Sequence, residues 1–233
     1  MILPPKNLNW KKLRPHLAKA HATLDRFNAA LALHRKPSAL FSHLSSHEML
    51  SDTLPLNLAV KRFAKHPLST ELICKIHKAI KSKTPYAKEA GKLRTRQNWI
   101  GPKGCSIDEA YFYPPEPKKV PRYMKKLHTY LHSKEKDLLV QLAIYFAQLL
   151  IIHPFMDGNG RVARAIIPLF LAEKKLIPAP LFFMSTYFKK HRLQYLKKLY
   201  AITEEGQWTE WVLFFLKGII EQGKTNISEL LGL

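Results

Sequence analysis

Cysteine is scarce in this sequence. The 233 residues include two, Cys74 and Cys105, which are too few for a disulfide framework and have no metal-binding spacing. We therefore expect a reducing, cytoplasmic setting. The N-terminus, MILPPKNLNWKK, lacks the basic and then apolar pattern of a secretory signal. Delivery into a host cell without such a signal is the alternative localisation.

Long apolar runs are also missing. The most apolar segment, residues 138–152, is interrupted by Gln141 and Gln148 and is too short to cross a bilayer. It predicts a buried core helix, and we expect no membrane span. With 46% hydrophobic residues, the chain has the composition of an ordinary globular protein.

Acidic residues are outnumbered. The sequence has 17 Asp and Glu against 38 Lys and Arg, which leaves a net charge of +21. This surplus indicates either a solvated basic surface or an acidic partner, such as nucleic acid, an anionic membrane face or an acidic protein. The cations are spread along the chain, which argues against a dedicated nucleic-acid binder. A basic nucleic-acid-binding or scaffold protein remains an alternative class.

Helical spacing of apolar residues dominates the chain. It predicts helices over 10–34 and 38–50, from Pro55 to Pro67, from a cap at Ser69 or Thr70, from Pro117, over 137–152, from near Arg161, and in two later segments. Pro168 should kink or split the helix that contains it. Residues 97–113 differ and favour a β-hairpin, with strands near 97–100 and 111–113 around a turn at 101–104. The fold class is therefore all-α with one inserted hairpin.

One segment, HPFMDGNGRVAR at residues 153–164, carries the chemistry. Pro154 should end the core helix near His153, and Asn159 is the expected N-cap of the next helix. Gly158 and Gly160 let backbone N–H groups turn toward one point, an arrangement that binds phosphate.

The charged residues of this segment fit the same interpretation. Arg161 and Arg164 are three residues apart, so their guanidinium groups project to one side and suit a polyphosphate. Asp157 beside such a nest is placed to hold Mg²⁺. Neighbouring cations should keep His153 neutral at pH 7 and able to accept a proton. Phe155 should anchor the loop in the core.

Each of these features taken alone is more often structural. Paired glycines are usually a turn, two arginines are usually a solvated face, and His77 and His128 are expected to be structural histidines. Together and in this order they form a specific pattern. The sequence contains no P-loop and no H-E-x-x-H motif.

Residues 153–164 match, without gaps, the signature H-x-F-x-[DE]-G-N-G-R-x-x-R, so the sequence resembles Fic-domain proteins. GKLRTRQNWIG and AYFYPPEP resemble the β-hairpin flap of that family, and PLSTELICKIH resembles the helix before it. The resemblance covers roughly residues 60–220 well and the first 55 loosely. It implies a Fic-type helical bundle with an inserted flap, divided into a helical extension (1–55), a Fic core (56–222) and a C-terminal tail (223–233).

The resemblance implies transfer of AMP from ATP to a Ser, Thr or Tyr hydroxyl of a target protein, with Mg²⁺ as cofactor. The implied roles are base (His153), Mg²⁺ ligand (Asp157), anion nest (Gly158, Asn159, Gly160), phosphate grip (Arg161), γ-phosphate grip (Arg164), adenine border (Tyr195) and target clamp on the flap (Trp99, Ile100). Relatives that phosphorylate have Lys where this chain has Gly160, which favours AMP transfer. Another nucleotide or donor, or phosphoryl transfer, remains the alternative reaction.

The sequence was also searched for an inhibitory segment. Many Fic proteins carry an inhibitory helix, [ST]-x-x-x-E-[GN], whose Glu pairs with the arginine matching Arg164. No segment of this sequence fits the whole pattern. Glu48 in SSHEML and Glu229 in TNISEL are the nearest candidates, and an antitoxin partner is the alternative regulator.

Overall fold

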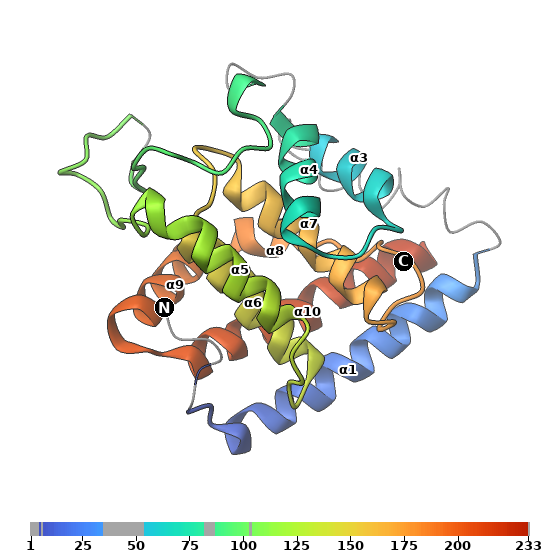
Figure 1. The fold of residues 1–233 in the computed structure, drawn as a ribbon. Helices are drawn as coiled ribbons and strands as arrows, with labels where there is room; N and C mark the ends of the chain where they lie inside the picture. Colours follow the sequence, from blue (N-terminus) through green and yellow to red (C-terminus); the bar gives the residue numbers. More distant parts are fainter. Residues whose placement is uncertain (1–4, 6, 35–53, 82–86, 103, 233) are drawn as a thin grey trace.

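The computed structural model describes residues 5, 7–34, 54–81, 87–102 and 104–232, and its secondary structure is helical. The helices are α1 (Trp10–Ala32), α3 (Leu54–Phe63), α4 (Thr70–Lys81), α5 (Val120–Leu131), α6 (Leu138–Ile152), α7 (Asn159–Glu173), α8 (Ser185–Lys190), α9 (Arg192–Glu205) and α10 (Trp208–Leu231) (Figure 1). Short 3₁₀ turns lie at Ala87–Glu89 and Pro117–Lys119. The all-α prediction is confirmed. The helix predicted over 38–50 lies outside the described residues.

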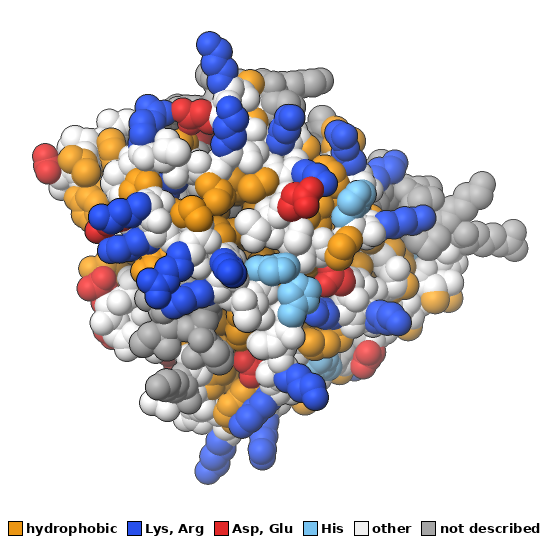
Figure 2. All heavy atoms as spheres, in the orientation of Figure 1, with side chains coloured by type: hydrophobic (Ala, Val, Ile, Leu, Met, Phe, Trp, Pro, Cys, Tyr) orange, Lys and Arg blue, Asp and Glu red, His pale blue; other side chains and the backbone are white. Residues whose placement is uncertain are grey.

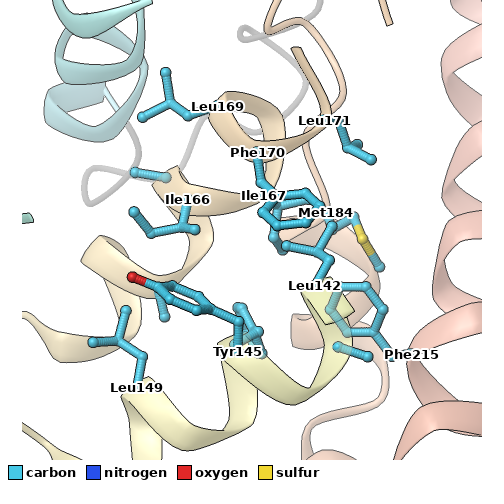
Figure 3. Close-up of a cluster of buried hydrophobic side chains, with 14 of the residues drawn as sticks. Leu142, Tyr145, Leu149, Ile166, Ile167, Leu169, Phe170, Leu171, Met184 and Phe215 are labelled. Carbon is cyan, nitrogen blue, oxygen red and sulfur yellow. The ribbon is translucent and has the colours of Figure 1, made fainter. Parts of the chain in front are cut away.

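Helix α6 lies at the centre, as its apolar sequence predicts. Asp137 caps its first turn, since its Oδ1 accepts hydrogen bonds from the N–H groups of Leu139 and Val140. Side chains of α6 face those of α7 across the core, for example Tyr145 and Ile166 (Figure 3). Burying side chains of this size stabilises the fold by about 1.5–3 kcal/mol each. This packing fixes the end of α6 against the start of α7.

Helix α7 runs from residue 159 to residue 173 without a break, although Pro168 lies inside it. Of the two predicted outcomes, a kink or a split, the split is wrong. Proline removes the N–H that would bond the carbonyl four residues earlier. Here Pro168 is buried with its neighbours Ile167 and Leu169, and burial of this face outweighs the missing hydrogen bond.

Helices α1 and α10 pack side by side along the lower edge of the bundle (Figure 1). A β-carbon added at Gly223 would lie 2.3 Å from Cγ2 of Thr23, so this close approach requires glycine. The predicted boundary at residue 222 falls inside α10, which continues to Leu231. The segment beyond residue 222 is thus the last part of α10, the helix against which α1 packs.

The region predicted as a β-hairpin, residues 97–113, is here called the flap. Within its described part, one isolated antiparallel bridge joins Ile100 and Phe112, and no strand forms. Ile100 donates to the Phe112 carbonyl at 3.0 Å, and both Tyr111 and Phe112 donate to the Ile100 carbonyl. Two donors that share one carbonyl interrupt the alternation that a strand ladder needs. Pro102, which has no N–H, limits pairing further.

Lys and Arg side chains are spread over the face drawn in Figure 2, and Asp and Glu occur among them singly. This distribution over the whole face agrees with the scattered cations of the sequence. Within the described ranges, no helix combines the length and apolar character needed to cross a membrane.

Candidate active site

The site is built on the loop between α6 and α7. His153 is the C-cap of α6 and has left-handed backbone angles, with φ 49° and ψ 60°. Its N–H still bonds the Leu149 carbonyl at 3.1 Å. A non-glycine residue in this region is uncommon and needs support from its surroundings.

Arg94 supplies that support. Its side chain is 3% exposed, and Nε donates to the His153 carbonyl at 2.8 Å while Nη2 lies 3.4 Å from the Ile152 carbonyl. Nη2 also donates to the Pro115 carbonyl, and the Arg94 N–H donates to the Pro154 carbonyl at 2.9 Å. A guanidinium group at a helix C-terminus satisfies carbonyls that have no intrahelical donor. Arg94 therefore fixes the end of α6 and the backbone of His153.

The imidazole of His153 has a defined tautomer. Nδ1 lies 3.2 Å from the Leu150 carbonyl, which can only accept, so Nδ1 carries the proton. The described residues form no hydrogen bond to Nε2, whose lone pair is thus available as a base. Removal from water lowers the pKa of His153 to about 4, and the Arg94 charge lowers it further against opposing effects of Leu150 and Asp157. This low pKa supports the prediction that His153 is neutral. The main cause of the lowered pKa is burial, and not the charge of the motif arginines.

Asn159 does not cap α7. The N-cap is Gly158, with φ 83°, and α7 begins at Asn159 itself. The Asn159 side chain is buried, where Oδ1 accepts from the Phe155 N–H at 2.9 Å and Nδ2 donates to the Phe155 carbonyl at 2.8 Å. The predicted N-cap is therefore wrong, because the buried loop offers Asn159 both a donor and an acceptor. Asn159 ties the loop closed.

Phe155 anchors the loop, as predicted. It is fully buried, and its ring stacks on His77 of α4 with centroids 3.8 Å apart. His77 accepts from the Gly91 N–H through Nδ1 and donates from Nε2 to the Asp157 carbonyl at 2.9 Å. Desolvation lowers the pKa of His77 to about 4, which agrees with a neutral structural histidine.

The carboxylate of Asp157 lies between cations. Oδ2 accepts from Lys81 Nζ and lies 3.5 Å from Arg161 Nη2, while Oδ1 accepts from the Gly158 N–H at 2.6 Å. Burial opposes ionisation, but the Lys81 and Gly158 hydrogen bonds and the charge of Arg161 outweigh it and hold the pKa of Asp157 below its usual value. Asp157 is therefore ionised at neutral pH.

The start of α7 provides the predicted anion-binding donors in part. The first N–H groups of a helix have no intrahelical acceptor and suit a phosphate. These belong to Asn159, Gly160 and Arg161, whereas the Gly158 N–H is already bonded to Asp157. A β-carbon added at Gly160 would lie 3.3 Å from Nη1 of Arg164, so that guanidinium lies over the first turn.

Tyr195 of α9 is near Arg164 but is part of an aromatic cluster. Its ring packs against Phe188 and Trp211, with centroid distances of 5.2 and 6.0 Å. Burial raises the pKa of Tyr195, and the charges of Arg164 and Arg192 act against that rise. The structure thus places Tyr195 near Arg164 with a clear packing role. Its predicted contact with adenine stays a prediction.

A pocket of about 420 Å³ opens between the loop and the flap. His153, Met156 and Asp157 line one wall, and the flap lines the other with Trp99 and Ile100 among its residues. Trp99 Nε1 donates to the Cys105 carbonyl at 3.0 Å, which fixes the indole ring. The predicted base, metal ligand and clamp residues therefore meet around one pocket.

The fit of Mg²⁺ depends on Asp157. Mg²⁺ takes oxygen ligands at about 2.0–2.1 Å in an octahedral arrangement. Within the described part of the chain, no group of three or more His, Cys, Asp or Glu side chains could hold a metal. Both oxygens of Asp157 are already bonded, one of them to an ammonium group. The residues present do not fit a divalent ion while Lys81 binds Asp157, and Mg²⁺ stays a prediction.

The two candidate inhibitory residues differ in what the structure says of them. Glu48 lies outside the described residues. Glu229 lies in the last turn of α10, where it is half-buried. The predicted pairing of a glutamate with Arg164 stays a prediction.

Sequence reasoning missed three residues that hold the site: Lys81, Arg94 and Asn98. Asn98 is buried and donates from Nδ2 to the Phe155 carbonyl at 2.9 Å, which links the flap to the loop. Lys81 continues the apolar stripe of α4, four residues after His77, and this spacing was the available signal. Nothing in the local sequence distinguishes Arg94 from the nearby exposed Arg96.

Comparison with known proteins agrees with this geometry. Residues 67–171 match the model of the Fic/DOC family. The Caenorhabditis briggsae protein named "Protein adenylyltransferase fic-1" is 28% identical over 126 residues, which cover 53% of this chain and 23% of that protein. "Probable protein adenylyltransferase aq_aa38" of Aquifex aeolicus is 34% identical over 110 residues, covering 43% of this chain and 34% of that protein. The matches thus span about a third or less of these relatives.

Solved structures show the same fold. A Fic family protein from Desulfovibrio desulfuricans G20 has a TM-score of 0.64 at 18% identity, over 96% of this chain and 69% of that one. A Fic domain containing signaling protein from Bacteroides thetaiotaomicron has a TM-score of 0.61 at 16% identity, over 97% and 92%. The α6–α7 loop lies within residues 67–171, and this segment of the chain is similar to the Fic/DOC family.

Proposed function

We propose that this protein transfers AMP from ATP to a hydroxyl group of a target protein. The observation that carries the proposal is His153, which has a neutral imidazole with a proton on Nδ1 and its Nε2 available beside a pocket. The start of α7 next to it suits a polyphosphate. Relatives named as protein adenylyltransferases support the same reaction class.

In the proposed reaction, Nε2 of His153 accepts the proton of a target Ser, Thr or Tyr hydroxyl. The hydroxyl oxygen attacks the α-phosphorus of ATP, the bond to the β-phosphate oxygen breaks, and pyrophosphate leaves. A base with a pKa of about 4 is weak in the free protein. The negative charge of bound ATP would raise that pKa toward neutrality and strengthen the base in the complex.

Charge at the phosphates is met by the N-terminus of α7 and by two arginines. Arg161 is 17% exposed and is oriented by Asp157, and Arg164 lies over Gly160. Two guanidinium groups beside helix N–H donors favour a triphosphate over a single carboxylate. Because Gly160 has no side chain, the first turn of α7 keeps space beside Arg164 that a longer side chain would occupy. These features support ATP as the donor.

The flap would hold the target segment. Its described part presents exposed Trp99, Tyr111 and Tyr113 near the pocket, and a single bridge leaves backbone groups for an added strand. Trp99 and Ile100 would then contact residues beside the modified hydroxyl. The net charge of +21 favours a target with an acidic surface.

Incubation of the protein with α-³²P-ATP and cell lysate tests the reaction. The wild type should label protein, and His153→Ala should label none. His132→Ala, which removes an exposed histidine of α5's end, is the matched control and should label like wild type. Equal labelling by wild type and His153→Ala would reject the mechanism. Label transferred from γ-³²P-ATP alone would support phosphoryl transfer instead.

A further inference from the structure

Lys81 is placed unusually for a lysine. Its side chain is 3% exposed, and its ammonium group bonds Oδ2 of Asp157, whose side chain is 47% exposed. Lysines normally extend their charge to solvent and are almost never enclosed without a partner. Here the ammonium group is buried and bonds Asp157, which is one of the residues that line the pocket.

The stem of Lys81 crosses the N-cap of α7. A β-carbon added at Gly158 would lie 3.2 Å from Cδ of Lys81 and 3.5 Å from the ring of His77. The ammonium group is therefore beside the helix start that would bind phosphate. Arg161 reaches the same Asp157 oxygen at 3.5 Å, so one carboxylate orients two cations there.

Helix α4 holds Lys81 in this position. His77, one turn earlier, donates to the Asp157 carbonyl and stacks on Phe155. Lys81 is the last residue of α4, where the helix dipole favours a cation. Two successive turns of the same helix thus contact the backbone and the side chain of Asp157. The ammonium position is fixed by the fold before any ligand binds.

We propose that Lys81 is a built-in counter-ion for the nucleotide phosphates, taking the place at Asp157 that a divalent cation would need. The inference rests on the proposed function. A metal within bonding distance of Oδ2 would lie directly beside the ammonium charge and would be repelled. An ammonium group binds phosphate as a point charge and can serve the same role. Nucleotide binding by this protein should depend weakly on divalent cations.

Isothermal titration of ATP into the full chain, in EDTA and in MgCl₂, tests the inference. All proteins carry His153→Ala so that no transfer occurs. The parent should bind ATP with dissociation constants that differ by less than about threefold between the two buffers. Lys81→Met, which keeps the length of the stem, should bind at least about tenfold more tightly with Mg²⁺ than in EDTA. Lys75→Met removes an exposed lysine of α4 and should match the parent.

Lys81→Gln is measured alongside, because it keeps a donor for Asp157 while it removes the charge, and thermal melts establish that each variant is folded. An equal Mg²⁺ effect in the parent and in both Lys81 variants would overturn the inference, as would a parent that binds ATP only with Mg²⁺. In those cases nucleotide binding itself is retained. Absence of ATP binding by every protein in both buffers would instead reject the proposed function, and the role of Lys81 with it.

Discussion

The two walls of the pocket differ in how they are held. On the loop wall, the carbonyls of Pro154, Phe155 and Asp157 each accept a hydrogen bond from a different part of the chain. On the flap wall, Asn98 bonds the loop and Trp99 bonds Cys105, but one isolated backbone bridge, Ile100 to Phe112, pairs its two sides, and aromatic side chains are exposed. Preorganised groups favour chemistry, whereas a loosely held edge can adapt to a partner. We infer that the loop wall is built for the reaction and the flap wall for recognition.

Arg94→Met should have the largest effect on stability, through the loop wall. The substitution removes the donor to the His153, Ile152 and Pro115 carbonyls and leaves buried acceptors without partners. We expect a loss of about 3–5 kcal/mol in the free energy of unfolding, measured by urea denaturation. Arg96→Met is the control: this exposed arginine pairs with Glu89 at the surface, and its loss should cost less than about 1 kcal/mol. Similar losses for both variants would contradict the role of Arg94.

Gly158→Ala should have the next largest effect. Gly158 has φ 83°, and an added β-carbon would also press on Lys81 at 3.2 Å. Gly206→Ala is the matched control, because Gly206 has φ 64° with nothing within 4 Å of an added β-carbon. The control should lose about 1 kcal/mol of stability from the left-handed conformation alone. Gly158→Ala should lose about 2–3 kcal/mol, since crowding adds to that strain. Equal losses in denaturation would show that Lys81 does not crowd the site.

The same contrast explains what the sequence could predict. The motif residues act locally, so Pro154 was enough to predict His153 at a helix end, and the apolar character of Phe155 was enough to predict it in the core. Lys81 and Arg94 act through partners 76 and 59 residues away, and each resembles a surface cation in its local sequence. The spacing of Lys81 on the apolar stripe of α4 hints at burial, whereas only tertiary packing distinguishes Arg94 from a surface arginine.

Two local predictions failed for related reasons. Asn159 has the chemistry of an N-cap, but the buried loop engages its side chain with Phe155 on both sides. The flap has a strand-like sequence, but a ladder needs regular backbone pairing, and Tyr111 and Phe112 share one acceptor. Local propensity was overridden by specific hydrogen bonds in both places.

Hydrogen exchange should sharpen the comparison between the walls. The amides of Ile100 and Phe112 bond each other's carbonyls across the single bridge, whereas the Val162 amide bonds the Gly158 carbonyl at the start of α7. The flap amides should exchange roughly 100-fold faster than that of Val162, because they can open without unfolding the core. Trp99→Ala should speed exchange in the flap and leave Val162 unchanged. Equal protection of all three amides would show that the flap is as firmly held as the loop.

The smallest effect concerns the far end of α6, where His21 Nε2 lies 2.8 Å from Asp137 Oδ2. The hydrogen bond to Asp137 raises the pKa of His21 against the effect of burial. Burial alone would raise the pKa of Asp137, but His21 and two backbone N–H groups lower it. The histidine contribution is present below its unfolded pKa and is lost as pH rises through the higher folded value. The carboxylate contribution is lost as pH falls through the lowered folded value.

His21→Gln should therefore cost most stability near pH 5, and the cost should shrink toward pH 8. The His21 side chain is 37% exposed, so solvent screening limits the contribution to about 1 kcal/mol or less. Urea denaturation of wild type and variant between pH 4 and pH 8 measures the difference. His66→Gln, at an exposed position after α3, should show no such maximum. A cost for His21→Gln that is independent of pH would mean that packing, and not the ion pair, is what ties α1 to the start of α6.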